Sequence, residues 1–478
     1  MVMGELSQDT ELLVIGGGPG GYAAAFRAAD LGMEVTLVDI MSKPGGVCLH
    51  RGCIPSKALL FMAEILHDAS RAEAMGVRFG KPDIDLEKLR GWKNEVVRRL
   101  TDGLAQLSQR RGVQLIQGRA AFEGPDTVRV HEADVGRIRF QKAIVATGSR
   151  VTGFPGVKRR KGGRIMTATG ALELADVPET LLVVGGGYVG LEIGSVYASL
   201  GSRVTLVEMA HALLPGADPD LVKPLHRRLD GLFEVIRLET RIESLKESED
   251  EVEVKFAEGG EDLPKRFARV LIAIGRKPNS TGLALEKASV ETDDNGFVIV
   301  DEQQRTSNER IYAVGDITGG MMLAHKASRE GKVAAEAIAG QPSAFDVRAI
   351  PAVVYTDPQV AWAGLTEQGA KAEGIDIQVQ RFPWKASGRA VTMGLEEGLT
   401  KLIVETETGR ILGVGVVGRG AEGLIAEGAL AIEMGALAED VALTVHPHPT
   451  LSETEGEAAE IFHGSPTHII AAGRKKAG

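Results

Sequence analysis

The stretch Leu12-Leu-Val-Ile-Gly-Gly-Gly-Pro-Gly-Gly21 returns, almost residue for residue, as Leu181-Leu-Val-Val-Gly-Gly-Gly-Tyr-Val-Gly190. The offset is 181 − 12 = 169 residues, and it also carries Val35-Thr-Leu-Val-Asp39 onto Val204-Thr-Leu-Val-Glu208 without a gap. One copy alone would be weak evidence, because G-x-G-x-x-G arises by chance in a chain with 60 glycines. Two copies in register predict two dinucleotide-binding units in one chain.

Each copy carries the three glycines of the dinucleotide fingerprint. They are Gly16, Gly18 and Gly21 in the first copy and Gly185, Gly187 and Gly190 in the second. The first glycine permits a tight turn, the second lets the backbone approach a pyrophosphate, and the third lets helix and strand pack closely. An acid ends the second strand of each copy, because Asp39 lies 39 − 21 = 18 residues past its last glycine and Glu208 lies 208 − 190 = 18 residues past its own. A carboxylate there can accept hydrogen bonds from a ribose diol.

Length and charge narrow the class of protein further. A chain of 478 residues predicts about three domains. The 55 basic and 65 acidic residues give a net charge of -10 without a basic stripe, so we expect neither a nucleic-acid nor a membrane partner. Residues 1–11 lack the basic start and apolar run of a secretory signal, and no stretch resembles a clean transmembrane helix. We therefore expect a cytoplasmic protein.

The two cysteines of the chain, Cys48 and Cys53, exclude a disulfide framework and a four-thiolate zinc site, so we expect no metal. Five residues of regular helix rise about 7.5 Å, beyond the usual disulfide limit of about 7 Å between Cα atoms. A bridge between them needs a distorted turn, which Gly52 and Pro55 could supply. Such a bridge would be readily reduced and re-formed, which indicates a catalytic role. The spacing alone leaves open a second interpretation, two reduced cysteines without a role.

The segment Gly45-Gly-Val-Cys48-Leu-His-Arg-Gly-Cys53-Ile-Pro-Ser-Lys57, with the two fingerprints and His448-Pro-Thr-Leu-Ser-Glu453, resembles the pyridine-nucleotide disulfide oxidoreductases. Within that family the chain is most similar to members that oxidise dihydrolipoamide. The resemblance implies an α/β fold with two Rossmann-like dinucleotide-binding domains, for FAD and NAD, and a C-terminal α+β dimerisation domain. Further markers extend nearly end to end: Ala146-Thr-Gly148, Gly190-Leu-Glu192, Ile274-Gly-Arg-Lys-Pro-Asn279, Ala313-Val-Gly-Asp316, Leu323-Ala-His-Lys326 and Asp357-Pro358.

The resemblance also implies roles for individual residues. Cys53 would lie against the flavin, and Cys48 would exchange with the substrate. Lys57 would lie near the flavin N5 and pair with Glu192, because a buried ammonium without a counter-ion is costly. The implied FAD site comprises Gly16, Gly18, Gly21, Asp39, Gly46, Lys57, Thr147, Gly148, Asp316, Ala324 and His325. The implied NAD site comprises Gly185, Gly187, Gly190, Glu208 and Gly275.

His448 is the implied catalytic base, and Glu453 would orient and charge-stabilise its imidazole. Pro447 and Pro449 flank this histidine, and their fixed φ angles keep the segment out of a helix. From its position alone, His446 is an alternative candidate for the catalytic base. In the resembling family the base reaches the disulfide from the other subunit of a homodimer, so we expect an isolated monomer to be inactive.

We expect residues 1–150 to form the first part of the FAD domain, 151–280 the NAD domain, 281–346 a return to the FAD domain and 347–478 the interface domain. Helical spacing predicts an amphipathic helix over 96–107, and we expect strands over 113–116, 127–130 and 138–145. Residues 402–405 and 411–416 predict a hairpin with its turn at 406–409, and 424–434 predicts a helix.

These expectations describe a flavin-dependent enzyme that oxidises protein-bound dihydrolipoamide and reduces NAD+, with NAD preferred because Glu208 would repel a 2′-phosphate. The implied partner is a lipoyl-bearing acyltransferase or a glycine-cleavage carrier protein. The alternatives are a related NAD(P)H-dependent disulfide reductase, a flavin NADH oxidase or transhydrogenase, and a docking subunit of a 2-oxoacid dehydrogenase complex without chemistry of its own. Val47, His50 and Arg51 depart from the usual family residues beside the disulfide, which leaves the thiol substrate open.

Overall fold

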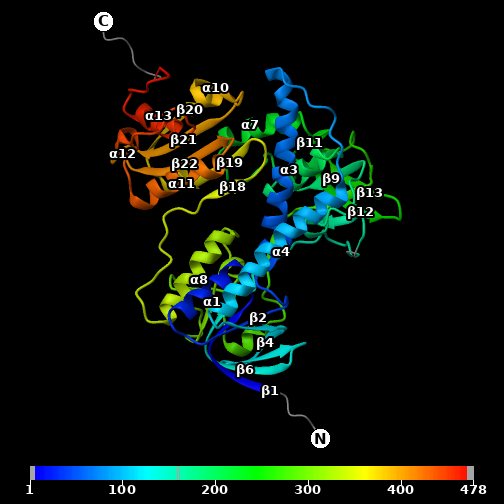
Figure 1. The fold of residues 1–478 in the computed structure, drawn as a ribbon, viewed down its shortest axis with the longest axis vertical. Helices are drawn as coiled ribbons and strands as arrows, with labels where there is room; N and C mark the ends of the chain where they lie inside the picture. Colours follow the sequence, from blue (N-terminus) through cyan, green and yellow to red (C-terminus); the bar gives the residue numbers. More distant parts are fainter. Residues whose placement is uncertain (1–5, 159, 161, 471–478) are drawn as a thin grey trace.

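The computed structural model describes residues 6–158, 160 and 162–470. Figure 1 shows a first α/β unit around β1, β2 and β6, a second unit around β9, and a C-terminal sheet beside the second unit. The same figure shows the long helices α3 and α4 running along the molecule between these parts. Their bounds are Cys53–Arg71 and Leu86–Arg110. The expected amphipathic helix over 96–107 lies within α4.

The first sheet has a parallel core in the order β3-β2-β1-β6, with β17 parallel to the other side of β6. Its apolar strand residues Leu12 to Val14 are fully buried, as expected of parallel strands covered on both faces. Helices α1 and α8 pack together beside this sheet, and the alanines of α1 allow their close approach. The bounds are β1 Leu6–Ile15, α1 Pro19–Asp30, β2 Val35–Asp39, β3 Gln114–Gln117, β6 Val135–Val145, β17 Ile311–Ala313 and α8 Ala324–Ile338. The chain therefore comes back to its first sheet after building the second.

The expected strands over 113–116, 127–130 and 138–145 correspond to β3, β5 and β6. Strand β4 between them was not predicted; it pairs antiparallel with β5, which pairs antiparallel with β6. The bounds of these two antiparallel strands are β4 Arg119–Gly124 and β5 Thr127–His131.

The second unit repeats the first in structure as well as in sequence. Its parallel sheet has the order β11-β10-β9-β15-β8. Leu181 pairs with Val204, as Leu12 pairs with Val35, so the offset of 169 residues holds in the strand register. Helix α6, Tyr188–Ser199, is displaced from α1 by the same 169 residues. The remaining bounds are β8 Ile165–Thr167, α5 Ala168–Leu172, β9 Thr180–Val184, β10 Arg203–Val207, α7 Pro219–Asp230, β11 Val235–Arg237 and β15 Arg269–Ile272.

Two smaller sheets accompany the second unit. An antiparallel sheet in the order β12-β13-β14 was not predicted from the sequence, and a two-stranded ribbon pairs β7 with β16. The bounds are β7 Ser149–Val151, β12 Arg241–Glu247, β13 Val252–Glu258, β14 Arg266–Phe267 and β16 Arg276–Pro278. The ribbon links the chain that leaves the first unit to the chain that returns to it.

The C-terminal unit is an antiparallel sheet in the order β18-β19-β22-β21-β20. The expected hairpin is present as β21 and β22, and the expected helix is α11, which packs on β19 and β22. Helix α13 packs against β20 and β21. The bounds are β18 Ala352–Val354, β19 Gln359–Gly364, α9 Glu367–Glu373, β20 Ile377–Pro383, α10 Gly388–Thr392, β21 Leu399–Glu405, β22 Ile411–Gly418, α11 Ala421–Met434, α12 Ala438–Leu443 and α13 Glu453–Phe462.

Short helices complete the described chain. They are α2 Gly46–Arg51 and the 3-10 helices η1 Ala72–Met75, η2 Leu285–Ala288, η3 Gly315–Thr318 and η4 Trp384–Ala386. Within the described ranges, no helix combines the length and the apolar character needed to cross a bilayer.

Candidate active site

The two glycine-rich turns have matching shapes. A Cβ at Gly21 would collide with the Gly16 carbonyl oxygen, and one at Gly190 would collide with that of Gly185. At the second glycine the surroundings are open: a Cβ at Gly187 would meet no described heavy atom within 4 Å, and one at Gly18 would meet Gly46 Cα at 3.9 Å. Glycine is required for packing at the first and third positions, and it leaves room for a ligand at the second. The described residues therefore fit a pyrophosphate at the start of α1 and another at the start of α6.

The two strand-ending acids also act alike. Asp39 accepts hydrogen bonds from the backbone N–H groups of Gly17 and Met41, at 2.6 and 2.7 Å. Glu208 accepts from Gly186 and Ala210, at 2.6 and 2.7 Å. Each carboxylate is thereby fixed beside its glycine turn, and its remaining lone pairs can accept further donors. The arrangement suits a ribose diol at both turns.

The two cysteines lie on either side of a break between helices. Helix α2 ends at Arg51 and α3 begins at Cys53, with Gly52 between them at φ -139° and ψ -109°. Gly52 therefore supplies the distorted turn that a bridge between the cysteines requires, whereas Pro55 lies in the first turn of α3. The glycine is also needed for packing, because a Cβ at Gly52 would lie 2.9 Å from the Val47 carbonyl oxygen. Both cysteines are thiols in this structure.

The two thiols differ in their acidity. Cys48 donates a hydrogen bond to the sulfur of Cys53, and this bond, together with burial, raises the pKa of Cys48. The same bond is the main cause that lowers the pKa of Cys53 to about 7; partial burial opposes the shift, and the Lys57 ammonium supports it. Cys53 reaches solvent in the single chain, yet enough protein surrounds it that desolvation counts against its thiolate. Near neutral pH the reduced pair therefore holds its negative charge on Cys53.

Lys57 lies one turn of α3 after Cys53 and forms the expected ion pair with Glu192. Its Nζ lies 3.0 Å from Oε1 and 2.8 Å from Oε2 of Glu192, which is 3% exposed. Tyr355, which the sequence did not identify, completes the group: its backbone N–H donates to Glu192 at 3.0 Å, and its ring centroid lies 4.4 Å from Lys57 Nζ. Residues from α3, α6 and the chain after β18 thus fix one ammonium beside the thiols.

Asp316 lies at the junction of the two units. Ser149 Oγ donates a hydrogen bond to Asp316, and Arg276 donates to both Ser149 Oγ and the Ser149 carbonyl oxygen, at 2.6 and 2.9 Å. Arg276 Nε lies 3.7 Å from the Asp316 carboxylate. The Gly315 N–H donates to the buried Glu330 at 2.7 Å, which fixes the backbone that carries Asp316. The sequence predicted Asp316 but not the two side chains that hold it.

The other predicted cofactor-site residues lie at chain turns and a helix start. Thr147 and Asn279 bind each other's carbonyl oxygens, at 3.1 and 2.9 Å, and Gly148 beside them has φ +67°. Gly46 adopts φ +61° against Gly18. Ala324 begins α8, and His325 Nε2 donates to the Pro351 carbonyl oxygen at 2.8 Å. Gly275 has φ +108° and accepts a bond from Thr152 N–H at 2.9 Å.

His448 and Glu453 form an imidazole–carboxylate pair. His448 Nδ1 lies 2.8 Å from Glu453 Oε1, and the other carboxylate oxygen accepts from Thr450 N–H at 2.7 Å. Burial alone would raise the pKa of Glu453, but the Thr450 and His448 bonds hold it below its ordinary value. The His448 side chain is 72% exposed, so its Nε2 edge faces solvent in the single chain. The pair has the geometry of a general base with its orienting acid.

The structure does not bring His448 to the cysteines of its own chain. His448 lies between α12 and α13, and Figure 1 shows these helices at the outer edge of the C-terminal unit, away from α3. Large apolar side chains of the C-terminal unit that are more than half exposed include Leu430 and Met434 of α11, Leu443 of α12, and Val445, three residues before His448. An exposed apolar face of this kind indicates a protein–protein interface.

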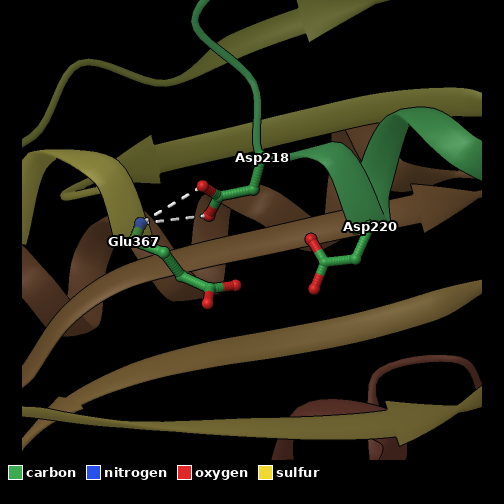
Figure 2. Close-up of side chains that lie close together, drawn as sticks. All are labelled: Asp218, Asp220 and Glu367. Carbon is green, nitrogen blue, oxygen red and sulfur yellow. Dashed lines mark hydrogen bonds between the residues drawn. The ribbon is translucent and has the colours of Figure 1, made fainter.

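Figure 2 shows a further group that the sequence did not reveal, the carboxyl groups of Asp218, Asp220 and Glu367. The backbone N–H of Glu367 donates to both Asp218 oxygens, at 3.2 and 3.3 Å. Lys401 of β21 is 1% exposed, and its ammonium lies 2.8 Å from Asp218 and 2.9 Å from Asp220. Arg381 donates to Asp220 at 2.6 Å. Lys401 and Arg381 thus balance the negative charge of these acids. The network joins the second unit to the C-terminal sheet.

Comparison with known proteins identifies similar sequences over nearly the whole chain. The family described as pyridine nucleotide-disulphide oxidoreductase matches residues 10–331, and the dimerisation domain of the same family matches residues 350–459. The chain is 47% identical over 463 residues to the dihydrolipoyl dehydrogenase of Vibrio parahaemolyticus, covering 96% of this chain and 97% of that protein. It is 45% identical over 471 residues to that of Geobacillus stearothermophilus, covering 98% and 100%.

Solved structures give the same result for the fold. LpdA from Mycobacterium tuberculosis matches with a TM-score of 0.87 at 27% identity, over 94% of this chain and 99% of that one. The HOCl-induced flavoprotein disulfide reductase RclA from Escherichia coli matches with a TM-score of 0.83 at 27% identity, also over 94% and 99%.

Proposed function

Because the chain belongs to the pyridine nucleotide-disulphide oxidoreductase family, we propose that it oxidises dihydrolipoamide to lipoamide and reduces NAD+ to NADH through a redox disulfide. The observation that carries this proposal is the Cys48 and Cys53 pair at the Gly52 break, with the lower pKa on Cys53 and the Lys57 ammonium beside it. A flavin reductase without thiol chemistry would not need two thiols of unequal acidity at this place.

FAD and NAD are the cofactors, and the two glycine turns fit them. We assign FAD to the first unit, with Gly16, Gly18, Gly21, Asp39, Gly46, Lys57, Thr147, Gly148, Asp316, Ala324 and His325. We assign NAD to the second unit, with Gly185, Gly187, Gly190, Glu208 and Gly275. When bound, FAD would supply the two-electron carrier between the thiol pair and NAD+. The corresponding segments are 1–150 with 281–346 for FAD and 151–280 for NAD, followed by the interface segment 347–478.

The chain's own residues carry out the sulfur exchange. In the oxidised enzyme Cys48 and Cys53 share a disulfide. A dihydrolipoyl thiol loses its proton to His448 and attacks the Cys48 sulfur, the disulfide breaks, and Cys53 leaves as a thiolate, which its low pKa favours. The second dihydrolipoyl thiol then attacks the substrate sulfur of the mixed disulfide. Its proton passes to the departing Cys48 sulfur, and lipoamide is released.

His448 and Glu453 serve the thiols of a second copy of the chain. The histidine is exposed on the apolar face that contains Val445, and a second copy is the partner that the dimerisation domain provides. Burying the exposed apolar side chains of this face between two subunits would place each His448 in a site that both subunits form and from which part of the water is excluded. Glu453 orients the imidazole and stabilises its cation after it accepts the proton.

The nucleotide preference and the protein partner are finer proposals. Glu208 lies where a 2′-phosphate would meet a negative charge, so we assign NAD rather than NADP. The natural substrate is dihydrolipoamide carried by a lipoyl-bearing acyltransferase or by a glycine-cleavage carrier protein.

The test is steady-state kinetics of the flavin-loaded homodimer and its Cys48→Ser variant. The wild type should reduce NAD+ with dihydrolipoamide, and Cys48→Ser should lose this activity at least a thousandfold while it still transfers electrons from NADH to a dye. A Cys48→Ser variant that still oxidised dihydrolipoamide would exclude the proposed exchange.

A further inference from the structure

A second imidazole–carboxylate pair lies beside the His448 and Glu453 pair. His446 Nε2 donates to Glu427 Oε1 of α11 at 2.7 Å. The two histidines are two residues apart but differ in exposure, because the His446 side chain is 9% exposed and that of His448 is 72% exposed. His446 is therefore fixed inside its own subunit, whereas His448 points outward. This contrast favours His448 as the base and His446 for a different task.

The ring of His446 also lies against α13, the helix that begins with Glu453. A Cβ at Gly456 would lie 3.0 Å from His446 Nδ1, closer than ordinary packing allows. Gly456 thus leaves the space that the imidazole occupies. Through this contact and the Glu427 bond, one side chain holds α11, the segment before His448, and α13 in a fixed relation.

The neighbouring Glu455 is a buried acid in the same place. It is 1% exposed, and among the described residues its Oε1 has no hydrogen-bond partner. Burial, and the charge of Glu427, raise the pKa of Glu455 well above its ordinary value. In its uncharged form Glu455 does not compete with Glu427 for His446. Burying such a group is costly and contributes little to packing, which is typical of a functional region.

We propose that His446 is a positioning residue: its bond to Glu427, in the space left by Gly456 beside Glu455, fixes the segment that presents His448 to the dithiol. This inference rests on the proposed function, because it assigns His446 to the dithiol half of the reaction. A displacement of about 1 Å at a catalytic group can cost roughly a hundredfold in rate. The NADH half of the reaction does not use His448 and is insensitive to His446.

The experiment compares His446→Leu and His446→Gln in the flavin-loaded homodimer, with His131→Gln as a control at an exposed histidine of β5. His446→Leu should lower kcat for dihydrolipoamide oxidation tenfold or more, with an unchanged KM for NAD+ and unchanged NADH-to-dye transfer. His446→Gln retains an N–H donor of similar reach and should remain within about threefold of the wild type. The control should match the wild type.

Glu427→Leu and the double variant with His446→Leu keep the inference testable if one variant folds poorly. Glu427→Leu should show the same selective loss of dihydrolipoamide oxidation. The double variant should be no slower than the slower of the two single variants. A His446→Leu enzyme within twofold of the wild type, a His446→Gln enzyme as slow as His446→Leu, or additive losses in the double variant would each overturn the inference. A wild type that does not oxidise dihydrolipoamide would instead overturn the proposed function.

Discussion

The negative charge on Cys53 should depend on the thiol of Cys48. The bond from Cys48 is the main cause of the lowered pKa, about 7 against an ordinary 9.0. A hydrogen bond to a charged group contributes about 1.5–3 kcal/mol, and one pKa unit corresponds to about 1.4 kcal/mol. Removing the bond should therefore raise the pKa of Cys53 by about 1–2 units.

A thiol is neutral below its pKa and becomes a charged thiolate above it, so a lower pKa means more thiolate at a given pH. At pH 7.5 a thiol with a pKa of about 7 is roughly three-quarters thiolate, whereas one at 9.0 is roughly 3% thiolate. The thiolate of Cys53 should therefore persist above about pH 7 and disappear on acidification. In Cys48→Ala it should appear only in more alkaline solution.

The assay is a pH titration of the flavin-loaded Cys48→Ala and Cys48→Ser variants, each of which retains one thiol. A thiolate beside oxidised flavin absorbs at long wavelength, and this band reports the charge on Cys53. Cys48→Ser keeps a hydroxyl donor and should titrate near pH 7, whereas Cys48→Ala should titrate about 1–2 units higher. Midpoints that agree within about 0.3 unit would refute the role given to the Cys48 bond.

Three further predictions concern the Lys57 ion pair, the exposed apolar face and the choice of nucleotide. Glu192→Leu leaves the Lys57 ammonium without its carboxylate and should lower the free energy of unfolding by about 1–3 kcal/mol in urea melts; a change below about 0.5 kcal/mol would contradict the ion pair's contribution. Val445→Glu places a charge on the exposed apolar face and should shift the protein to monomer in gel filtration, with loss of dithiol oxidation but not of dye reduction; an active dimer would speak against that face as the interface. Glu208→Arg should raise the kcat/KM ratio of NADP+ over NAD+ at least tenfold, and an unchanged ratio would show that Glu208 does not select the nucleotide.

The two nucleotide units could be predicted from the sequence because each fingerprint glycine is required for a steric reason, and the spacing of these glycines is visible in the sequence. The 169-residue offset reappears in the register of Leu12 with Val35 and of Leu181 with Val204. The helix break at Gly52 followed from the distance limit between two cysteines, which is also a local property. Predictions of this kind succeed because the constraint lies within a few consecutive residues.

The features that were missed depend on partners far apart in the chain. Lys401 binds Asp218 and Asp220, which are 183 and 181 positions away, and no local pattern predicts such a network. Tyr355 contributes a backbone N–H to Glu192, which any residue type except proline could supply at that position. The sheet β12-β13-β14 is a different case, because Val252, Val254 and Phe256 alternate with polar positions along β13, and this local pattern does predict a half-buried strand.

The proposal that His448 acts on the thiols came only from the family resemblance. Its exposure and its partner Glu453 are properties of the single chain, but its approach to the thiols requires a second copy. The differing exposures of His446 and His448 could not be read from a sequence in which both precede a proline.

The most direct test of the electron path is anaerobic addition of dihydrolipoamide to the purified homodimer, followed by NAD+, while the visible spectrum is recorded. The thiol relay predicts that dihydrolipoamide produces the long-wavelength thiolate band and that one equivalent of NAD+ removes it with formation of NADH. A protein that holds flavin but whose spectrum does not change with dihydrolipoamide would contradict the passage of electrons through Cys48 and Cys53.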